Sequence, residues 1–493
     1  MSTLIYLLMI IVIVLYTIAL TFIFLYSLAQ AHLVYLYLKY FKKEQNPLQL
    51  LDNEFPMVTI QLPVYNEKYV VERLIDSTLK IEYPAEKLEI QILDDSTDET
   101  TEIIKNKIQS LQTDVSINHV RRKDRKGFKA GALAYGMKIA KGEYLAIFDA
   151  DFIPNPDFLK STLPYFKNSK VGVVQSKWEH INENFSLLTK LQAFGLDAHF
   201  TIEQSGRNKG NFFINFNGTA GIWRKSCIED AGGWQDDTLT EDLDLSYRAQ
   251  LRGWKFVYLK NLGNPAELPI AMNSLKSQQY RWTKGAAECA RKNLPVFLKD
   301  KSISFLTKIH GFFHLMNSAI FISIILLSVL SVPLFFIKKT YPEFGKLFKM
   351  GSFFVISLLI VSLFYLVAEI SNEKKITKGV GHYLYKFPLF LAFSMGLSLH
   401  NAIAVLEGYF GKKTPFVRTP KFNVTTPTRN WKANIYLDKK IHPLSLIELF
   451  LSIYFLWGVS LAFAYHQYEL LPLHLLLSFG FGIVGFYSIK HAH

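Results

Sequence analysis

The sequence predicts an α/β domain with a Rossmann-like, mostly parallel sheet, set within an α-helical protein that crosses a membrane several times. Apolar blocks long enough to cross a bilayer lie near both ends of the 493-residue chain. Between them, from Pro56 to about Lys299, short apolar runs alternate with segments of helical periodicity. This alternation is typical of the strands and helices of a doubly wound sheet. We therefore expect one soluble domain, residues 55–300, between two membrane regions.

Charge and cysteine content narrow the class of protein. Lys and Arg number 55 against 41 Asp and Glu, for a net charge of +14, and the mean hydropathy is +0.15. Between Gly411 and Lys440, eight basic residues accompany the single Asp438, and this cluster lies beside an apolar block. That position favours contact with lipid headgroups or an anionic substrate, and not with nucleic acid. With only Cys227 and Cys289, no disulfide framework is expected, which is typical of a reducing compartment.

The first apolar block predicts an N-terminal transmembrane helix within residues 1–40. Its apolar stretch, Leu4 to Leu28, exceeds the ~20 residues that cross a bilayer and lacks a signal-peptide cleavage motif. Basic residues follow it at Lys39, Lys42 and Lys43, and none precedes it. The positive-inside rule then puts the N-terminus outside and the middle domain in the cytoplasm. We expect a multi-pass integral membrane protein, in the plasma membrane or, in a bacterium, the inner membrane.

The C-terminal region, residues 301–493, contains further spans and one segment with two interpretations. The predicted spans lie at about 310–337, 352–370, 444–465 and 470–488. A crossing by the apolar segment 386–408 would put residues 411–440 outside, against the positive-inside rule, and His400, Asn401 and Glu407 interrupt that segment. We therefore expect 386–408 to lie in the membrane interface, which gives five spans in all; a sixth crossing is the alternative. Four lysines argue against this topology, because it places their loop outside, where the positive-inside rule disfavours basic residues. They are Lys338, Lys339, Lys346 and Lys349.

Within the middle domain, the expected elements follow one another along the chain. They are a strand at 58–62, a helix at 67–79, a strand at 88–93, a helix at 99–111 and a strand at 144–148. The second strand ends in Asp94-Asp95-Ser96-Thr97-Asp98, and the third runs into Asp149-Ala150-Asp151. Ligands collect at the carboxyl ends of strands in such sheets, so both acidic groups should face one cleft.

Asp149 and Asp151 are the candidate metal ligands. Two carboxylates one residue apart at a strand end can hold Mg²⁺ or Mn²⁺, which prefer oxygen, and such a cation neutralises a leaving diphosphate. An Asp-x-Asp pair alone occurs often by chance, and a loop of solvated acids is the other interpretation. At the second strand, Asp95 should hold a nucleotide while Ser96 or Asp98 caps the next helix.

Lys129 is the candidate phosphate ligand. It follows the basic run Arg121–Lys126 and lies at the start of an expected helix among small residues. Cations and the exposed N–H groups of a helix start both bind diphosphate. For the run Arg121–Lys126 itself, a solvated charge cluster is the other interpretation.

Asp242, in the motif Thr240-Glu241-Asp242, is the candidate general base. It begins an expected helix at 243–251 and would take the proton from an acceptor hydroxyl in a single inverting displacement. The rival chemistry is glycoside hydrolysis by two carboxylates, which would have no use for a metal-binding strand end.

The run Gln278-Gln279-Tyr280-Arg281-Trp282 supplies the remaining groups. Arg281 offers a cation for a departing diphosphate, Trp282 an indole face for a sugar ring, and Gln278 hydrogen bonds to donor or acceptor. As an alternative, Tyr280 and Trp282 belong to an interfacial aromatic belt before the next span.

These motifs, in this order, resemble the processive family-2 glycosyltransferases of the cellulose synthase superfamily, whose pattern is D, DxD, TED and QxxRW. The likeness is greatest to cellulose-synthase-like glucomannan and mannan synthases and covers Pro56 to Lys299 densely. It is carried by Pro63-Val64-Tyr65-Asn66-Glu67, Leu93-Asp94-Asp95-Ser96-Thr97-Asp98, Phe216-Asn217-Gly218-Thr219-Ala220-Gly221, Ala231-Gly232-Gly233-Trp234 and Leu251-Arg252-Gly253-Trp254-Lys255. The resemblance implies a cytoplasmic GT-A domain that forms β-linkages with inversion and uses Mg²⁺ or Mn²⁺.

The resemblance also implies further site residues. They are Pro63, Tyr65 and Glu67 at the donor, Asn217 and Gly218 at the acceptor, and Thr240 and Glu241 beside Asp242 in the catalytic motif. A gating loop at 411–425 would close over the donor through Phe416, Thr419 and Lys421, with Arg418 where the family has Val. An amphipathic interface helix is expected at 186–205.

Two functions fit these features. In the first, hexose passes from a nucleotide sugar, UDP-glucose or GDP-mannose, to the non-reducing end of a β-linked glucan, mannan or glucomannan, which moves through the enzyme's own spans. In the alternative, a single sugar is added to a membrane lipid, diacylglycerol or ceramide. The run Gln278–Trp282 and the several C-terminal spans favour the polymer. The expected partners are the donor, the β-glycan acceptor and the lipid bilayer, and the sequence leaves accessory subunits open.

Overall fold

A seven-stranded mixed sheet forms the centre of the α/β domain in the computed structural model, which describes residues 3–40, 55–341, 344, 351, 355–424, 431, 434–437 and 440–492. The strands are β1 (Val58–Val64), β2 (Leu88–Asp94), β3 (Ser116–Arg121), β4 (Tyr144–Ile147), β5 (Val171–His180), β6 (Gly221–Arg224) and β7 (Lys255–Ala266). Their order is β3-β2-β1-β4-β6-β5-β7. Neighbours pair in parallel except β6, which runs antiparallel to β4 and β5. The predicted Rossmann-like, mostly parallel sheet is confirmed, with β6 as an antiparallel insertion.

Apolar side chains cover both faces of the sheet, which explains the near-continuous apolar runs of its central strands. Along β4, Tyr144 and Ala146 pack into one core while Leu145 and Ile147 pack into the other. The surrounding helices are α2 (Val71–Thr78), α3 (Thr100–Ser110), α4 (Phe128–Ile139), α5 (Phe158–Thr162), α8 (Lys225–Asp230) and α9 (Glu241–Leu251). The predicted helix at 67–79 begins later, at Val71, because residues 67–70 form a turn in which the N–H of Val70 donates to the carbonyl oxygen of Glu67.

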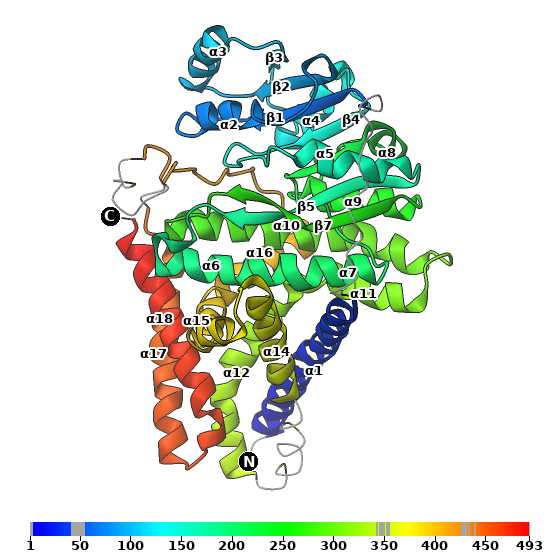
Figure 1. Cartoon of the computed structure of the whole chain (residues 1–493). Coiled ribbons are helices and arrows are strands. Elements are labelled where there is room, and N and C mark those ends of the chain that lie inside the picture. The colour runs from blue at the N-terminus through cyan, green and yellow to red at the C-terminus, as the bar shows by residue number, and fades with distance from the viewer. Residues whose placement is uncertain are drawn as a thin grey trace.

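A long helix lies between the sheet and the membrane helices (Figure 1). It starts at a capping box formed by Ser186 and Thr189. It then runs through α6 (Leu187–Ala198), a π turn (His199–Glu203) and α7 (Gln204–Lys209). This helix occupies the range 186–205, where an interface helix was predicted, and continues past it. α10 (Met272–Lys299) runs through the same layer of the molecule (Figure 1).

Five stretches of the described residues are long and apolar enough to cross a membrane: Leu4–Tyr40, Asn317–Thr340, Val355–Asn372, Pro443–Ala464 and Tyr468–Lys490. They contain α1 (Thr3–Tyr40), α12 (Ile320–Thr340), α14 (Val355–Asn372), α17 (Pro443–Ala464) and α18 (Leu471–Lys490), which extend from one side of the α/β domain (Figure 1). The predicted span at 310–337 starts too early, since residues up to Leu315 belong to a separate helix, α11 (Phe305–Leu315). The basic residues Lys42, Lys43, Lys346 and Lys349 lie outside the described residues.

The segment 386–408 falls on two helices, α15 (Ile376–Gly396) and α16 (Ser398–Tyr409), which meet at a bend of 50°. The chain enters the pair beside the α/β domain, because Asn372, the last residue of α14, accepts hydrogen bonds from Lys177 Nζ (2.9 Å) and Thr201 Oγ1 (3.1 Å) shortly before α15 begins. It also ends there: a Cβ atom on Gly408 would lie 2.7 Å from the carbonyl oxygen of Lys284 in α10. Both ends of the pair therefore lie next to the domain that carries the predicted site.

Candidate active site

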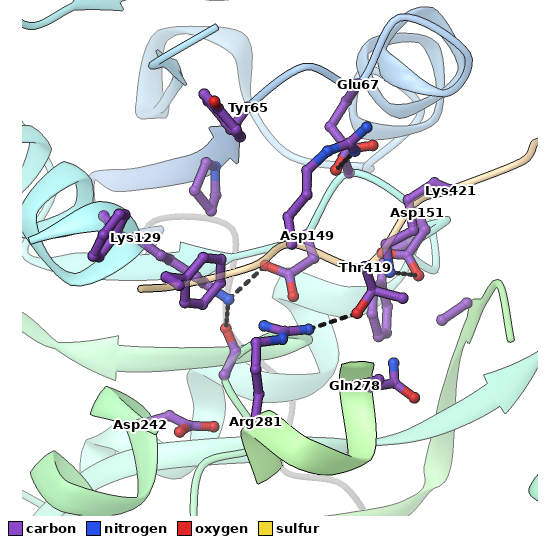
Figure 2. Close-up of a pocket in the computed structure, with 18 of the residues that line it drawn as sticks. Tyr65, Glu67, Lys129, Asp149, Asp151, Asp242, Gln278, Arg281, Thr419 and Lys421 are labelled. Carbon is purple, nitrogen blue, oxygen red and sulfur yellow. Dashed lines mark hydrogen bonds and ion pairs between the residues drawn. The ribbon is translucent and has the colours of Figure 1, made fainter. Parts of the chain in front are cut away.

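One pocket, at the carboxyl ends of β1, β2 and β4, collects every residue that the sequence predicted for the site (Figure 2). These residues are Pro63, Tyr65, Glu67, Asp95, Lys129, Asp149, Asp151, Asn217, Gly218, Thr240, Glu241, Asp242, Gln278, Arg281, Trp282, Phe416, Thr419 and Lys421. The first turns of α4 and α9, the N-terminal half of α10 and residues 416–421 close the pocket around the strand ends. Segments that are far apart in the sequence thus meet in a single cleft.

The carboxylates of Asp149 and Asp151 follow β4 directly and have different neighbours. The N–H of Asp149 donates to Thr219 Oγ1 (2.9 Å), and its Oδ1 accepts from Lys129 Nζ (2.5 Å). The side chain of Asp151 is only 4% exposed; its Oδ2 accepts from Lys421 Nζ (2.7 Å), and its buried Oδ1 has no hydrogen-bond partner among the described residues. A buried anionic oxygen without a partner is unfavourable, and a divalent cation that binds oxygen would satisfy it. The two carboxylates therefore fit the predicted metal site.

Lys129, in the first turn of α4, joins the two acidic motifs. Its ammonium donates to Asp149 and to the carbonyl oxygen of Gly218 (2.9 Å; Figure 2). Burial disfavours the charged ammonium, but Asp149, Glu241 and Asp242 outweigh burial and raise the pKa of Lys129. The lysine thus stays charged, and its contact with a phosphate stays a prediction.

Asp242 lies in the first turn of α9, buried beside Glu241. Burial and then the charge of Glu241 raise the pKa of Asp242 to about 7, although Lys129 opposes the shift. Burial raises the pKa of Glu241 as well. The N–H of Leu243 donates to Asp242 Oδ1 (2.9 Å) and orients the carboxyl group. A fixed carboxyl group with a pKa near neutrality has the properties of a general base.

Gly218 lies against the carboxyl group of Asp242, where a larger residue would displace it. Its φ is +80°, and a Cβ atom on it would lie 3.0 Å from Asp242 Oδ2 and 3.5 Å from Lys129 Nζ. The left-handed backbone and the close approach each favour glycine. The neighbouring Asn217 is fixed at both ends: its Oδ1 accepts from Gln204 Nε2 (2.7 Å) and its N–H donates to Gln175 Oε1 (3.0 Å).

The spacing of Gln278, Arg281 and Trp282 is that of one helix face, and α10 turns all three into the pocket. One turn further, Gly285 lets α10 approach the catalytic motif, since a Cβ atom there would lie 2.5 Å from Thr240 Cγ2. The helix that carries the predicted sugar platform therefore also positions the motif that contains the predicted base.

Residues 416–424, which include the predicted gating residues, form a strap across the pocket. Arg281 Nη2 donates to Thr419 Oγ1 (2.8 Å), and the Arg281 guanidinium lies 4.8 Å from the ring centre of Phe416. At the other end of the strap, Glu267 accepts the N–H groups of Phe422 (2.8 Å) and Asn423 (3.0 Å). The last residue of the predicted gating loop, residue 425, lies outside the described residues. The strap is thus attached to the domain toward both of its ends.

Arg418 of the strap stands where the resembled family has Val. Its Nη1 lies 2.7 Å from Glu67 Oε1, and its guanidinium lies 4.2 Å from the ring centre of Tyr436. Burial raises the pKa of Glu67 to about 7, while Arg418 and then Lys421 oppose the shift. The departure from the family pattern therefore supplies a cation opposite a buried carboxyl group.

Near the ends of β1 and β2, the predicted nucleotide ligands are already engaged by arginines. Arg122 binds Asp95 with two nitrogens, Nε to Oδ1 at 2.9 Å and Nη2 to Oδ2. The guanidinium of Arg125 lies 3.3 Å from the ring centre of Tyr65. The contacts of Asp95 and Tyr65 with a donor stay predictions.

Several lining residues with polar or aromatic side chains were not predicted as site residues. They are Arg125, Phe128, Phe152, Trp178, His180, Glu267 and Arg418. Two of them, Trp178 and His180, lie on β5, a strand that was not predicted at all. Their alternation with Lys177 and Glu179 is the period of two that is typical of a half-buried strand and could have revealed it.

Comparisons with known proteins agree with this geometry. The family described as "Glycosyltransferase like family 2" matches residues 56–285. Glucomannan 4-beta-mannosyltransferase 7 of Arabidopsis thaliana is 33% identical over 490 residues, which cover 92% of this chain and 83% of that protein. Glucomannan 4-beta-mannosyltransferase 1 of Oryza sativa subsp. japonica is 42% identical over 268 residues, 53% of this chain and 51% of that protein. Among solved structures, the mannosyltransferase PcManGT from Pyrobaculum calidifontis, in complex with GDP-Man and Mn²⁺, has a similar fold, with a TM-score of 0.54 at 18% identity over 81% of this chain and 100% of that chain.

The fold and the pocket define a glycosyltransferase of the GT-A class with helices that can span a membrane. The chain belongs to glycosyltransferase family 2, among the cellulose-synthase-like members that include the glucomannan 4-beta-mannosyltransferases. This membership confirms the family, the fold class and the enzyme class that the sequence analysis predicted.

We predict that Gly218→Ala lowers the rate of sugar transfer about a hundredfold, because the added methyl group displaces Asp242 and small misplacements of reacting groups have effects of that size. Gly233→Ala is the matched control: Gly233 has a φ of +73°, and no described atom lies within 4 Å of its Cβ position. Both variants introduce comparable backbone strain, and only the first crowds the pocket. Equal rates for the two variants, measured with radiolabelled donor, would contradict the assigned contact.

Proposed function

We propose that this protein transfers a hexose, in the first place mannose from GDP-mannose, to the non-reducing end of a growing β-linked mannan or glucomannan. The observation that carries the proposal is the single pocket in which Asp149, Asp151, Asp242 and Trp282 all meet. The names of the relatives support mannose and a glucomannan product. UDP-glucose is the other donor that the sequence analysis expected, and the test below includes it.

Asp149 and Asp151 are the residues that would hold Mg²⁺ or Mn²⁺. A divalent cation bound there neutralises the charge that develops on the departing diphosphate. The Mn²⁺ and GDP-Man in the complex of the structural relative PcManGT support this assignment. Lys421 and Arg281, at the same side of the pocket, provide further positive charge for the diphosphate.

Asp242 acts as the general base in this proposal. The acceptor hydroxyl oxygen forms a bond to the anomeric carbon while the bond from that carbon to the diphosphate oxygen breaks. The diphosphate leaves with the bonding electron pair, and the hydroxyl proton passes to the Asp242 carboxylate. Because attack and departure occur on opposite faces of the sugar, the configuration inverts and an α-linked donor gives a β-linked product.

The acceptor lies against Trp282, near Asn217 and Gly218, which line the pocket on the Asp242 side. An indole face packs well against a sugar ring, and the fixed amide of Asn217 offers hydrogen bonds to hydroxyl groups. This arrangement suits a saccharide end that is extended one unit at a time.

The α/β domain lies in the cytoplasm in this proposal, and five helices cross the membrane. The pair α15–α16 does not cross, in keeping with the position of both its ends beside the domain. Two of the basic residues that opposed this topology have partners on the far side of the membrane. Lys338 pairs with Glu469, and Lys339 lies 4.0 Å from the ring centre of Tyr465. Both lysines therefore have local partners at that position, although the positive-inside rule counts Lys and Arg and gives acids little weight.

Purified protein in detergent should transfer sugar from GDP-mannose, tested beside UDP-glucose, UDP-N-acetylglucosamine and UDP-galactose. We expect a product that stays in the aqueous phase and elongates with time, because the proposed acceptor is a glycan. A product that partitions into chloroform would contradict the polymer and favour a lipid acceptor. Transfer from UDP-glucose alone would contradict mannose as the sugar.

The acid limb of the pH profile should report Asp242. Its pKa of about 7 means that the carboxyl group is protonated and inactive as a base below that pH, so kcat/KM should rise with pH through this region. Glu241→Gln removes a charge that raises the pKa of Asp242 and should move the rising limb to lower pH.

Asp242→Asn should lower kcat by at least about a hundredfold while donor binding persists. An active Asp242→Asn variant would remove Asp242 from the base role.

Chelation with EDTA should stop turnover, and added Mn²⁺ or Mg²⁺ should restore it.

Lys421→Met should strengthen Mn²⁺ binding about fivefold, because it removes an ion pair that competes for Asp151 and is worth about 1 kcal/mol. The measurement is Mn²⁺ binding followed by electron paramagnetic resonance, independent of activity. Lys421→Arg, which retains the charge, is the control and should bind Mn²⁺ as the unaltered protein does. Unchanged Mn²⁺ affinity in Lys421→Met would contradict the competition.

A further inference from the structure

We propose that Trp178 is a second acceptor-binding aromatic residue, which packs beside Trp282 in the pocket and hydrogen-bonds a hydroxyl group of the saccharide through its indole N–H. The inference rests on the proposed function and extends it, because it gives the acceptor subsite two adjacent aromatic residues in place of one. Trp178 comes from the end of β5 and Trp282 from α10, and both line the pocket. Their ring centres are 6.4 Å apart, with an angle of 54° between the planes.

The position of Trp178 is fixed by other aromatic rings. Phe152, just after the metal-binding motif, meets it edge-on at 5.3 Å, and Phe200 packs on it at 5.1 Å. Phe200 belongs to the π turn His199–Glu203, which also brings His199 Nε2 to 3.5 Å from the Asn217 amide nitrogen. π turns occur frequently at functional sites, where the extra residue in the turn re-aims side chains. Here the turn supports both Trp178 and Asn217, on the side of the pocket assigned to the acceptor.

The indole N–H of Trp178 has no partner among the described residues, where Nε1 is buried and forms no hydrogen bond. The nearby His180 side chain is 4% exposed, and its Nε2 lies 3.4 Å from Asp197 Oδ1. Leaving a buried donor unsatisfied destabilises a protein by about 1–3 kcal/mol, so such groups usually await a ligand or a water.

A sugar ring matches these features better than a lipid chain does. Its C–H face packs on indole rings, and its hydroxyl groups both donate and accept hydrogen bonds. An alkyl chain would leave the N–H of Trp178 unsatisfied. The pocket wall on β5 therefore favours a saccharide as the group next to the reacting hydroxyl.

An unsatisfied indole N–H by itself would not single out Trp178. Trp223 and Trp234 also have a buried Nε1 without a partner in the described residues, yet neither lines the pocket. They pack on each other, 5.8 Å apart, in the core behind the sheet. Trp234 therefore provides a matched control, because the same substitution removes the same kind of N–H at a residue that does not line the pocket.

The test compares Trp178→Phe with Trp234→Phe in the full-length protein. Phe retains an aromatic ring at this position and removes the N–H together with one ring of the indole, so we expect the acceptor KM for β-1,4-linked mannohexaose to rise about tenfold for Trp178→Phe. The donor KM should stay within twofold, and Trp234→Phe should leave both values unchanged. Trp178→Leu, which also removes the ring, should raise the acceptor KM further, as should Trp282→Ala.

Direct binding of mannohexaose, measured by calorimetry, distinguishes failure of the proposed function from failure of the acceptor wall, the surface formed by Trp178 and Trp282. If binding weakens about tenfold in Trp178→Phe while the protein transfers sugar from none of the donors tested, the proposed function fails and the acceptor wall stands. If transfer occurs and Trp178→Phe retains the unaltered acceptor KM and affinity, the acceptor wall is overturned and the proposed function stands. Binding of GDP-mannose shows that each variant is folded. Equal losses for donor and acceptor in Trp178→Phe would mean a structural role only.

Discussion

The balance of charge in the pocket is the constraint that the surrounding structure serves. Asp149, Asp151, Glu241 and Asp242 all face one cleft, and without nearby cations they would repel one another and take up protons. The groups that offset them are Lys129 from α4, Lys421 from the strap and Arg281 from α10. Three of the elements that cover the strand ends, α4, α10 and the strap, thus contribute cations to the site. The strap in particular is held over the pocket by the acids that it neutralises.

This balance also distinguishes the surroundings of the acidic residues. Asp149 and Asp151 each have a lysine in contact, whereas Asp242 has Glu241 beside it and only a more distant attraction from Lys129. The third of these carboxyl groups, that of Asp242, is therefore poised to exchange a proton near neutral pH. Within a single cleft, the distribution of the cations separates the groups suited to metal binding from the one suited to act as a base.

Much of this arrangement could be predicted from the sequence, because the chemistry lies on short motifs at strand ends and on one helix face. Asp149 was expected at the end of a strand, and Gln278, Arg281 and Trp282 were expected in one functional run. All four side chains line the pocket in the structure. The strand β5 was missed because its apolar half, 171–174, is too short to distinguish a strand from a buried helix, and only the alternation of residues 177–180 indicates it. The arginine partners of Asp95 and Glu67 were also missed. Ion pairs such as Arg418 with Glu67 join residues remote in sequence, and no local pattern encodes them.

The two faces of α10 explain why the same run of residues suggested both a sugar platform and a membrane-interface belt. Gln278 and Trp282 face the pocket, while Lys276 and Tyr280 point the other way. Lys276 pairs with Glu448 of α17 at 2.7 Å, and the Tyr280 hydroxyl bonds to Glu407 of α16. Trp282 is therefore a pocket residue, and only the opposite face of the helix belongs to the membrane region. A sugar chain that stacks on Trp282 would begin its path on the helix that anchors the α/β domain to α16 and α17. In such an arrangement the distance from the reacting hydroxyl to the membrane helices is fixed, and the chain can advance without movement of the domain relative to the spans.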